Sequence, residues 1–239
     1  GADRTPYEFD GMFGRPYQDL HLVDVSSGEW KKFQEKVRYN FGASPGGRYI
    51  LYLKDDHYLV YDIQADRHTD ISADVPTSFV DQEYDHPVAQ KPPFGVAGWT
   101  EDDKTILVYD KYDIWQIRPD ASRATNLSNG REERIRHRYV RLDDEEEFID
   151  DSAPLYASTY GEWSKKYGIT RLQPGKTPER VVWADDNVAR LTKAEDADIF
   201  AYMVQDFDDS PDYFVSGPDF TKTRQVTHTN PFQKEYAWG

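Results

Sequence analysis

The sequence predicts an all-β fold, a partial β-propeller with about four complete four-stranded blades, and two observations lead to this prediction. The first is a repeated phrase: an aromatic and β-branched strand, a polar turn, and a second strand ending in Thr or Ser. The second is the spacing, since successive first strands end 38, 54, 55 and 44 residues apart. Hairpins repeated about every 40–50 residues are typical of propeller blades. These strands end at Val25, Ile63, Ile117, Leu172 and Ser216.

Each blade is expected to begin with a hairpin upstream of the repeated phrase. Residues 43–52 and 98–109 place a Gly- or Asp-rich turn between a short strand and an apolar strand, and 189–202 form a weaker copy. We therefore expect an arc of a larger propeller, in which residues 236–238 resemble the first strand of a later element. The predicted blades cover residues 38–72, 95–128, 134–183 and 187–228, with a partial blade at 17–37.

Residues 73–95 interrupt this pattern. Proline cannot donate to a central ladder, so the four prolines of the segment predict a long loop on one propeller face. No amphipathic helix is predicted anywhere in the chain. The prolines are Pro76, Pro87, Pro92 and Pro93.

Alternation along the strands predicts which side chains fill the blades. Aromatic residues make up 15% of the chain, with 17 Tyr and 6 Trp, which suits blades packed face to face through large side chains. The predicted core residues are Tyr49, Leu51, Leu59, Trp99, Leu107, Trp115, Ile117, Leu155, Phe200 and Phe214.

The composition limits the partners. A net charge of −15 repels nucleic acid and anionic membranes, so neither is expected as a partner. No run of 18 apolar residues occurs, and no membrane span is predicted. The absence of cysteine excludes disulfides and a Cys nucleophile without defining the compartment. The first and last residues look like those of a piece cut from a longer chain, which leaves the localisation unknown.

One string matches the G-x-S-x-G pattern of serine hydrolases, Gly42 to Gly46. In that motif the residue after the serine donates its backbone N–H to the oxyanion hole, and here Pro45 has none. A strand pattern follows where the motif requires a helix. We therefore interpret the string as a turn and expect Ser44→Ala to change little.

No catalytic, cofactor-binding or metal-binding residue is predicted from spacing. The six histidines show no H-x-x-x-H or H-x-H pattern. Residues 206–212 offer several carboxylates but lack the Gly and terminal Glu of an EF-hand, which indicates a polar loop and leaves Ca²⁺ binding open. The histidines are His21, His57, His68, His86, His137 and His228.

A second acidic run follows a strand with one arginine-rich face. Arg134, Arg136 and Arg138 alternate with other residues, and the acidic residues 143–147 then indicate a solvated turn. The functional alternative is a substrate-binding site formed by Glu145, Glu146 and Glu147.

Several strings go beyond a generic propeller. They are residues 125–131 leading into 134–136, 139–143 followed by 154–158, and 212–216 leading to 225–227 and the ending 230–239. In these strings the chain resembles the propeller of large prolyl oligopeptidase family serine peptidases, and it is most similar to the secreted, dipeptidyl peptidase-like type.

The resemblance implies a division of labour. A Ser-Asp-His triad would lie in a downstream α/β-hydrolase domain, so this chain by itself would not be an enzyme. The propeller would cap the hydrolase cavity, admit short peptides and exclude folded proteins. In dipeptidyl aminopeptidases a Glu pair on a blade holds the ammonium group of the substrate, and Glu145–Glu147 would correspond to it here. The resemblance also favours a periplasmic or secreted location.

The alternative function is a stand-alone propeller of the TolB or WD-repeat kind that acts as a protein-binding scaffold. In either case exposed blade edges would leave backbone donors and acceptors unpaired, which predicts self-association.

Overall fold

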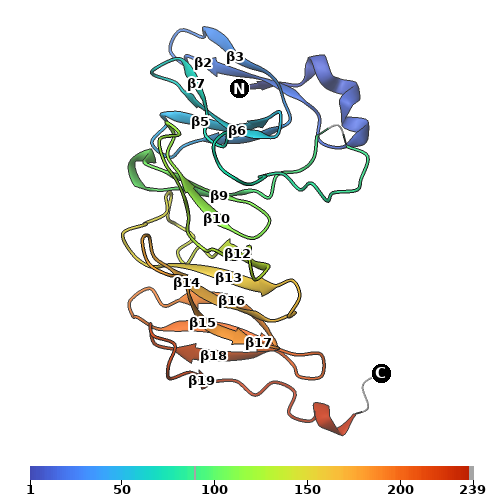
Figure 1. The fold of residues 1–239 in the computed structure, drawn as a ribbon, viewed down its shortest axis with the longest axis vertical. Coiled ribbons are helices and arrows are strands. Elements are labelled where there is room, and N and C mark those ends of the chain that lie inside the picture. The colour runs from blue at the N-terminus through green and yellow to red at the C-terminus, as the bar shows by residue number, and fades with distance from the viewer. Residues whose placement is uncertain (89, 237–239) are drawn as a thin grey trace. The chain divides into compact units, whose positions relative to one another are not determined.

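The computed structural model describes residues 1–88 and 90–236, and almost all of its regular structure is β-strand (Figure 1). The described strands form four four-stranded antiparallel sheets and one three-stranded sheet, in which neighbours follow chain order. The chain is therefore an all-β protein with the repeated four-stranded blades of a partial propeller. It divides into two compact units, residues 1–111 with 116–125, and residues 112–115 with 126 onward.

The first unit begins with the three-stranded sheet, whose strands are β1 (Ala2–Asp3), β2 (Gln18–Val23) and β3 (Trp30–Val37). A 3-10 segment, η1 (Thr5–Phe13), lies between β1 and β2 and is kinked at Tyr7. Neither η1 nor β1 was predicted, because both are short and carry no periodic apolar pattern. The next sheet contains β4 (Tyr39–Ala43), β5 (Tyr49–Lys54), β6 (His57–Asp62) and β7 (Arg67–Asp70).

The third sheet consists of β8 (Val96–Trp99), β9 (Ile106–Tyr109), β10 (Ile114–Ile117) and β11 (Ala124–Asn126), with η2 (Glu101–Asp103) after β8. The segment before it holds one isolated bridge, from Val80 to Pro93. Phe79 and Val80 are buried, so apolar side chains anchor this long segment without a ladder.

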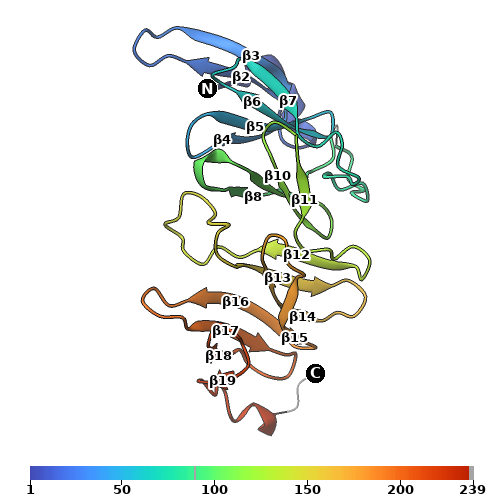
Figure 2. The same cartoon turned by 60° about the vertical axis from the view of Figure 1, so that its left-hand side comes forward.

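The second unit carries two further sheets (Figure 2). One contains β12 (Ile135–Tyr139), β13 (Leu155–Gly161), β14 (Tyr167–Leu172) and β15 (Glu179–Ala184). The other contains β16 (Asn187–Lys193), β17 (Phe200–Gln205), β18 (Asp212–Ser216) and β19 (Arg224–Gln225), followed by the 3-10 turn η3 (Gln233–Glu235). Residues 237 and 238 of the predicted later strand lie outside the described residues.

The repeated phrase has a common hydrogen-bond pattern. In two sheets a backbone N–H donates to the hydroxyl of the residue 14 positions later. Ile114, the first residue of β10, donates to Ser128 (3.1 Å), and Tyr213, the second residue of β18, donates to Thr227 (2.8 Å). That hydroxyl in turn donates to the aspartate immediately before the donating residue, Asp113 or Asp212 (both 2.7 Å). In these two phrases the terminal Ser or Thr hydroxyl therefore links the end of the phrase back to its first strand.

A variant of the pattern occurs at β6. Tyr58 N–H donates to Ser72 (2.9 Å), whose hydroxyl donates to Asp70 (3.0 Å). Here His57 stands in the position of the aspartate, and its Nδ1 lies 2.8 Å from Asp70. The carboxylate is therefore supplied by Asp70 on the neighbouring strand β7, and the Ser72 hydroxyl still accepts a backbone N–H and donates to a carboxylate.

Of the predicted core, seven side chains are buried: Leu51, Trp99, Leu107, Trp115, Ile117, Leu155 and Phe200. Tyr49, Leu59 and Phe214 are only half-buried. On β6 the fully buried residues are instead Tyr58, Val60 and Tyr61. Strict alternation fails there because side chains on both faces of the strand are buried. Tyr61, on the second face, belongs to a core cluster with Leu20, Val37 and Tyr52.

Candidate functional site

Ser44, the serine of the G-x-S-x-G string, lies in the turn between β4 and β5. Its side chain is buried and donates a 2.6 Å hydrogen bond to Asp103, which also accepts the Gly46 N–H (3.0 Å). The Ser44 oxygen accepts the Tyr49 N–H (3.1 Å). A buried hydroxyl held between these groups is a structural element of the turn. The expectation that Ser44→Ala changes little overlooked this buried carboxylate, which no local pattern indicated.

Glu145, Glu146 and Glu147 lie in the loop between β12 and β13. Glu145 and Glu147 are exposed, whereas Glu146 is half-buried. The Arg141 guanidinium donates to the backbone carbonyl of Glu146, and the Glu145 N–H donates to Asp143 (2.9 Å). The three carboxylates therefore share one loop whose backbone is held by its neighbours.

Burial raises the pKa of Glu146, and the nearby carboxylate of Asp143 raises it further, while Arg141 opposes the shift. A carboxylate in this environment gains most from a cationic partner, because a cation restores the charged form that burial disfavours. An ammonium group would provide such a cation.

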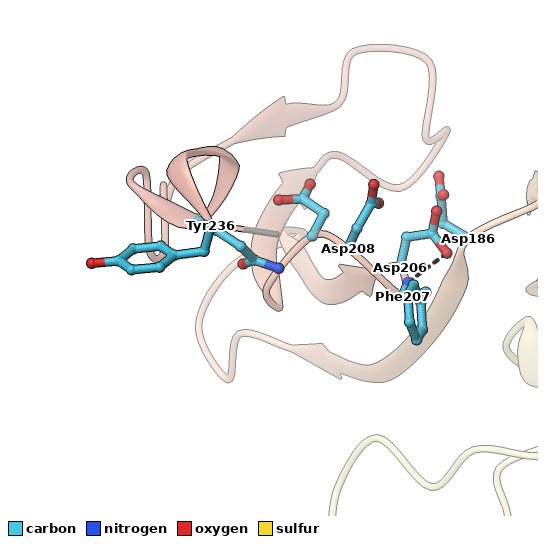
Figure 3. A pocket seen from close by; sticks show the side chains of 7 residues that line it. Asp186, Asp206, Phe207, Asp208 and Tyr236 are labelled. Atoms are coloured by element: carbon cyan, nitrogen blue, oxygen red, sulfur yellow. Dashed lines mark hydrogen bonds between the residues drawn. The ribbon is translucent and has the colours of Figure 1, made fainter. Parts of the chain in front are cut away.

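A cavity of about 670 Å³ lies in the second unit, beside the β17–β18 loop (Figure 3). Asp206, Asp208 and Asp209 from this loop line it together with Asp186 from the β15–β16 turn. Figure 3 shows the carboxylates of Asp186, Asp206 and Asp208 directed to the same side. The sequence pointed to residues 206–212, whereas Asp186 joins them only through the pairing of β16 with β17.

The rest of the lining combines aromatic and polar groups. Phe207 and Tyr236 are exposed, and buried Gln233 accepts a 2.6 Å hydrogen bond from Ser210. Within residues 1–88 and 90–236 none of the four carboxylates forms an ion pair. The same part of the chain contains no group of three His, Asp or Glu residues arranged to hold a metal ion. The cavity is thus strongly negative and partly apolar.

The histidines are dispersed over the structure. His57 and His86 lie beside Asp70 and Asp85, and His68 Nδ1 is 2.7 Å from the Tyr52 hydroxyl. His137 on β12 is buried, and its Nδ1 has no hydrogen-bond partner in the described part of the chain. Burial lowers the pKa of His137, which favours the neutral ring. None of these four lies in the Glu145–Glu147 loop or in the lining of the acidic cavity.

Comparison with solved structures supports the fold through one of the three similar proteins described here, the dipeptidyl peptidase with a TM-score above 0.5. Dipeptidyl peptidase 4 from Porphyromonas gingivalis is similar over 90% of this chain and 36% of its own, with 13% identity and a TM-score of 0.55. A puromycin hydrolase matches over 90% of this chain and 34% of its own (12% identity, TM-score 0.46). A putative TolB from Agrobacterium tumefaciens matches over 87% of this chain and 88% of its own (10% identity, TM-score 0.31).

The chain thus spans about a third of the length of the two hydrolases. No protein-family model matches the sequence, and no curated protein matches it. In the part of the chain described, the 3-10 turns lack the length and apolar character that a membrane-crossing helix needs.

Proposed function

We propose that this chain is the non-catalytic propeller domain of a serine peptidase of the prolyl oligopeptidase family, and that it restricts access of substrates to a hydrolase domain in the same protein. The observation that carries the proposal is the fold shared with P. gingivalis dipeptidyl peptidase 4 over 90% of this chain but 36% of that one. The remaining part of that peptidase, which this chain does not match, is long enough to contain a separate catalytic domain. The peptidase-like strings of the sequence agree with this interpretation.

The chemistry of the chain supports a binding role more than a catalytic one. Ser44 is buried against Asp103, so the one G-x-S-x-G string offers no accessible nucleophile. Acyl transfer requires a positioned base and oxyanion donors, each of which contributes orders of magnitude to the rate. We therefore assign the hydrolytic step to the other domain and substrate selection to the propeller.

Charge provides the selection. A net charge of −15 attracts cationic groups, and in a short peptide the free amino terminus is such a group. We assign its recognition to Glu145, Glu146 and Glu147, of which Glu146 is half-buried and gains most from a cation. The cavity around Asp206 is a second acidic surface and provides an internal comparison.

The test compares the 239-residue chain with the complete gene product. Both are treated with a fluorophosphonate probe and then offered a short peptide and a folded protein. We expect labelling and peptide cleavage only in the complete product, with the folded protein left intact. An unlabelled, inactive complete product would favour the binding-scaffold alternative.

Substrate recognition is tested in the complete product with Glu145, Glu146 and Glu147 changed to Gln. KM should rise for peptides with a free amino terminus and stay unchanged for the same peptides after N-acetylation. Asp206→Asn is the matched control, because it removes a carboxylate from the other acidic surface. Equal effects of both changes on KM would show a general field effect and would contradict the assignment to the glutamate loop.

A further inference from the structure

Arg38, between β3 and β4 in the first unit, is a buried cation without an acceptor in the described part of the chain. Its side chain is 2% exposed, and its Nε has no hydrogen-bond partner among the described residues. The guanidinium lies over the Tyr17 ring, 4.2 Å from the ring centroid. A ring face attracts a cation, but it accepts none of the in-plane N–H groups of the guanidinium.

Arg48 provides a comparison, because it has the carboxylate partner that Arg38 lacks among the described residues. It also lies over a tyrosine ring, that of Tyr49 at 5.0 Å, and it donates to the carboxylate of Asp62 (2.9 Å). Buried charges are normally paired in this way, because an uncompensated one is strongly destabilising. In that pair the buried charge is Asp62, and Arg48 itself is exposed, whereas Arg38 is buried and has no carboxylate partner among the described residues.

Two more cations lie near the same tyrosines. The Arg15 guanidinium is 5.9 Å from the Tyr39 ring centroid, and the Lys36 ammonium is 5.3 Å from that of Tyr17. Both residues are exposed, and neither side chain forms an ion pair within the described part of the chain. A carboxylate does lie nearby, because buried Asp19 accepts the Lys36 backbone N–H (3.0 Å), but it is paired with Lys32 (3.0 Å) and not with these three cationic side chains.

The backbone approaches the guanidinium closely at Gly14. Gly14 adopts a φ of +117°, and a Cβ there would lie 3.2 Å from Arg38 Nη1. Burial raises the pKa of Tyr39, and the charges of Arg38 and Arg15 oppose that rise, so both cations act on the same side chain.

We propose that Arg38, supported by Arg15 and Lys36 between Tyr17 and Tyr39, forms a binding site for the carboxylate group of a ligand. The Nε edge of a guanidinium offers two parallel N–H groups that match the two oxygens of a carboxylate. A carboxylate carries one charge, whereas the net charge of −15 opposes a multiply charged anion more strongly. The proposal does not depend on the peptidase assignment, because all of these residues belong to this chain.

Three dipeptides test the site by thermal shift and titration calorimetry on the 239-residue chain. N-acetyl-Ala-Ala carries a terminal carboxylate, N-acetyl-Ala-Glu-amide a side-chain carboxylate, and N-acetyl-Ala-Ala-amide none. We expect either or both carboxylate peptides to raise Tm with concentration, and the stronger one identifies the source of the group. The neutral amide, and sodium sulfate at matched ionic strength, should have a smaller effect.

Arg38→Met should lower the affinity for the carboxylate peptides about tenfold or more, as expected when a charged hydrogen-bond donor is lost. Arg38→Lys keeps the charge but loses the paired N–H groups, so it should also weaken binding if Arg38→Met does not fold. Arg48→Met is the matched control and should keep the response.

Three results would overturn the proposal. The first is no response in the unaltered chain, which is expected if water alone satisfies the guanidinium. The second is an equal response to sulfate or to the neutral amide. The third is a full response in both Arg38 variants.

Discussion

Ser44 and Asp103, 59 residues apart in the sequence, share a buried 2.6 Å hydrogen bond between hydroxyl and carboxylate. The same carboxylate accepts the Gly46 N–H, and the same hydroxyl accepts the Tyr49 N–H. The pair thus ties the β4–β5 turn to η2, and it turns a string that resembles a catalytic motif into a structural contact.

We predict that Ser44→Ala lowers the free energy of unfolding by about 1–3 kcal/mol, because it leaves a buried carboxylate without one of its donors. Urea unfolding followed by fluorescence measures the change. Ser122→Ala removes a similar hydroxyl from Asp120 at the surface and serves as the control, with an expected effect near zero. Equal losses in the two variants would contradict a special role for the buried pair.

Trp99→Ala should lower the free energy of unfolding by about 3–5 kcal/mol, the usual cost of emptying a large aromatic core site. Trp99 is 7% exposed, and its ring stacks on Tyr49 at a centroid distance of 5.6 Å. Trp163→Ala, at a residue that is 74% exposed, should stay within about 0.5 kcal/mol. The prediction fails if denaturant midpoints shift equally for both tryptophans.

His137 should make the fold sensitive to acid. Burial lowers its pKa in the folded state, and Asp113 opposes this shift without cancelling it. The folded state therefore resists protonation, so the contribution to stability is complete above the unfolded pKa of about 6.5 and is lost as the pH falls below it.

The measurement is Tm from about pH 7.5 to about pH 5, a range centred near the unfolded pKa of histidine. Tm should fall more steeply for the natural sequence than for His137→Gln, which cannot titrate. Gly130 supports this choice of residue, because a Cβ there would lie 2.7 Å from His137 Nδ1 and the ring has little freedom to turn. Parallel pH profiles of the two proteins would refute the prediction.

The last sheet should take part in self-association. Tyr213, Val226 and Phe232 leave large apolar surfaces exposed at β18 and after β19, and such groups promote contacts between chains. Sedimentation should show concentration-dependent species in the micromolar range, and Phe232→Lys should shift them toward the monomer. Phe9→Lys on η1 is the control, with no shift expected. A chain that remains monomeric throughout would rule out this surface as an interface.

The sequence by itself determined the strands, their hairpins and the recurring Ser or Thr, because these follow from local alternation, turn chemistry and a fixed period. The 14-residue separation of Ile114 from Ser128 and of Tyr213 from Thr227 is part of that period, so the repeat already contained it. The short elements β1 and η1 have no period, and no local pattern predicted them.

Only the tertiary structure decided which polar groups meet. It placed Asp103 against Ser44, brought Asp186 to the carboxylates of residues 206–209, and left Arg38 without an acceptor among the described residues. Alternation shows which face a side chain occupies, but partners come from segments distant in sequence. The energy of a buried charge or hydroxyl depends on those partners, and they are defined only when the sheets and loops pack together.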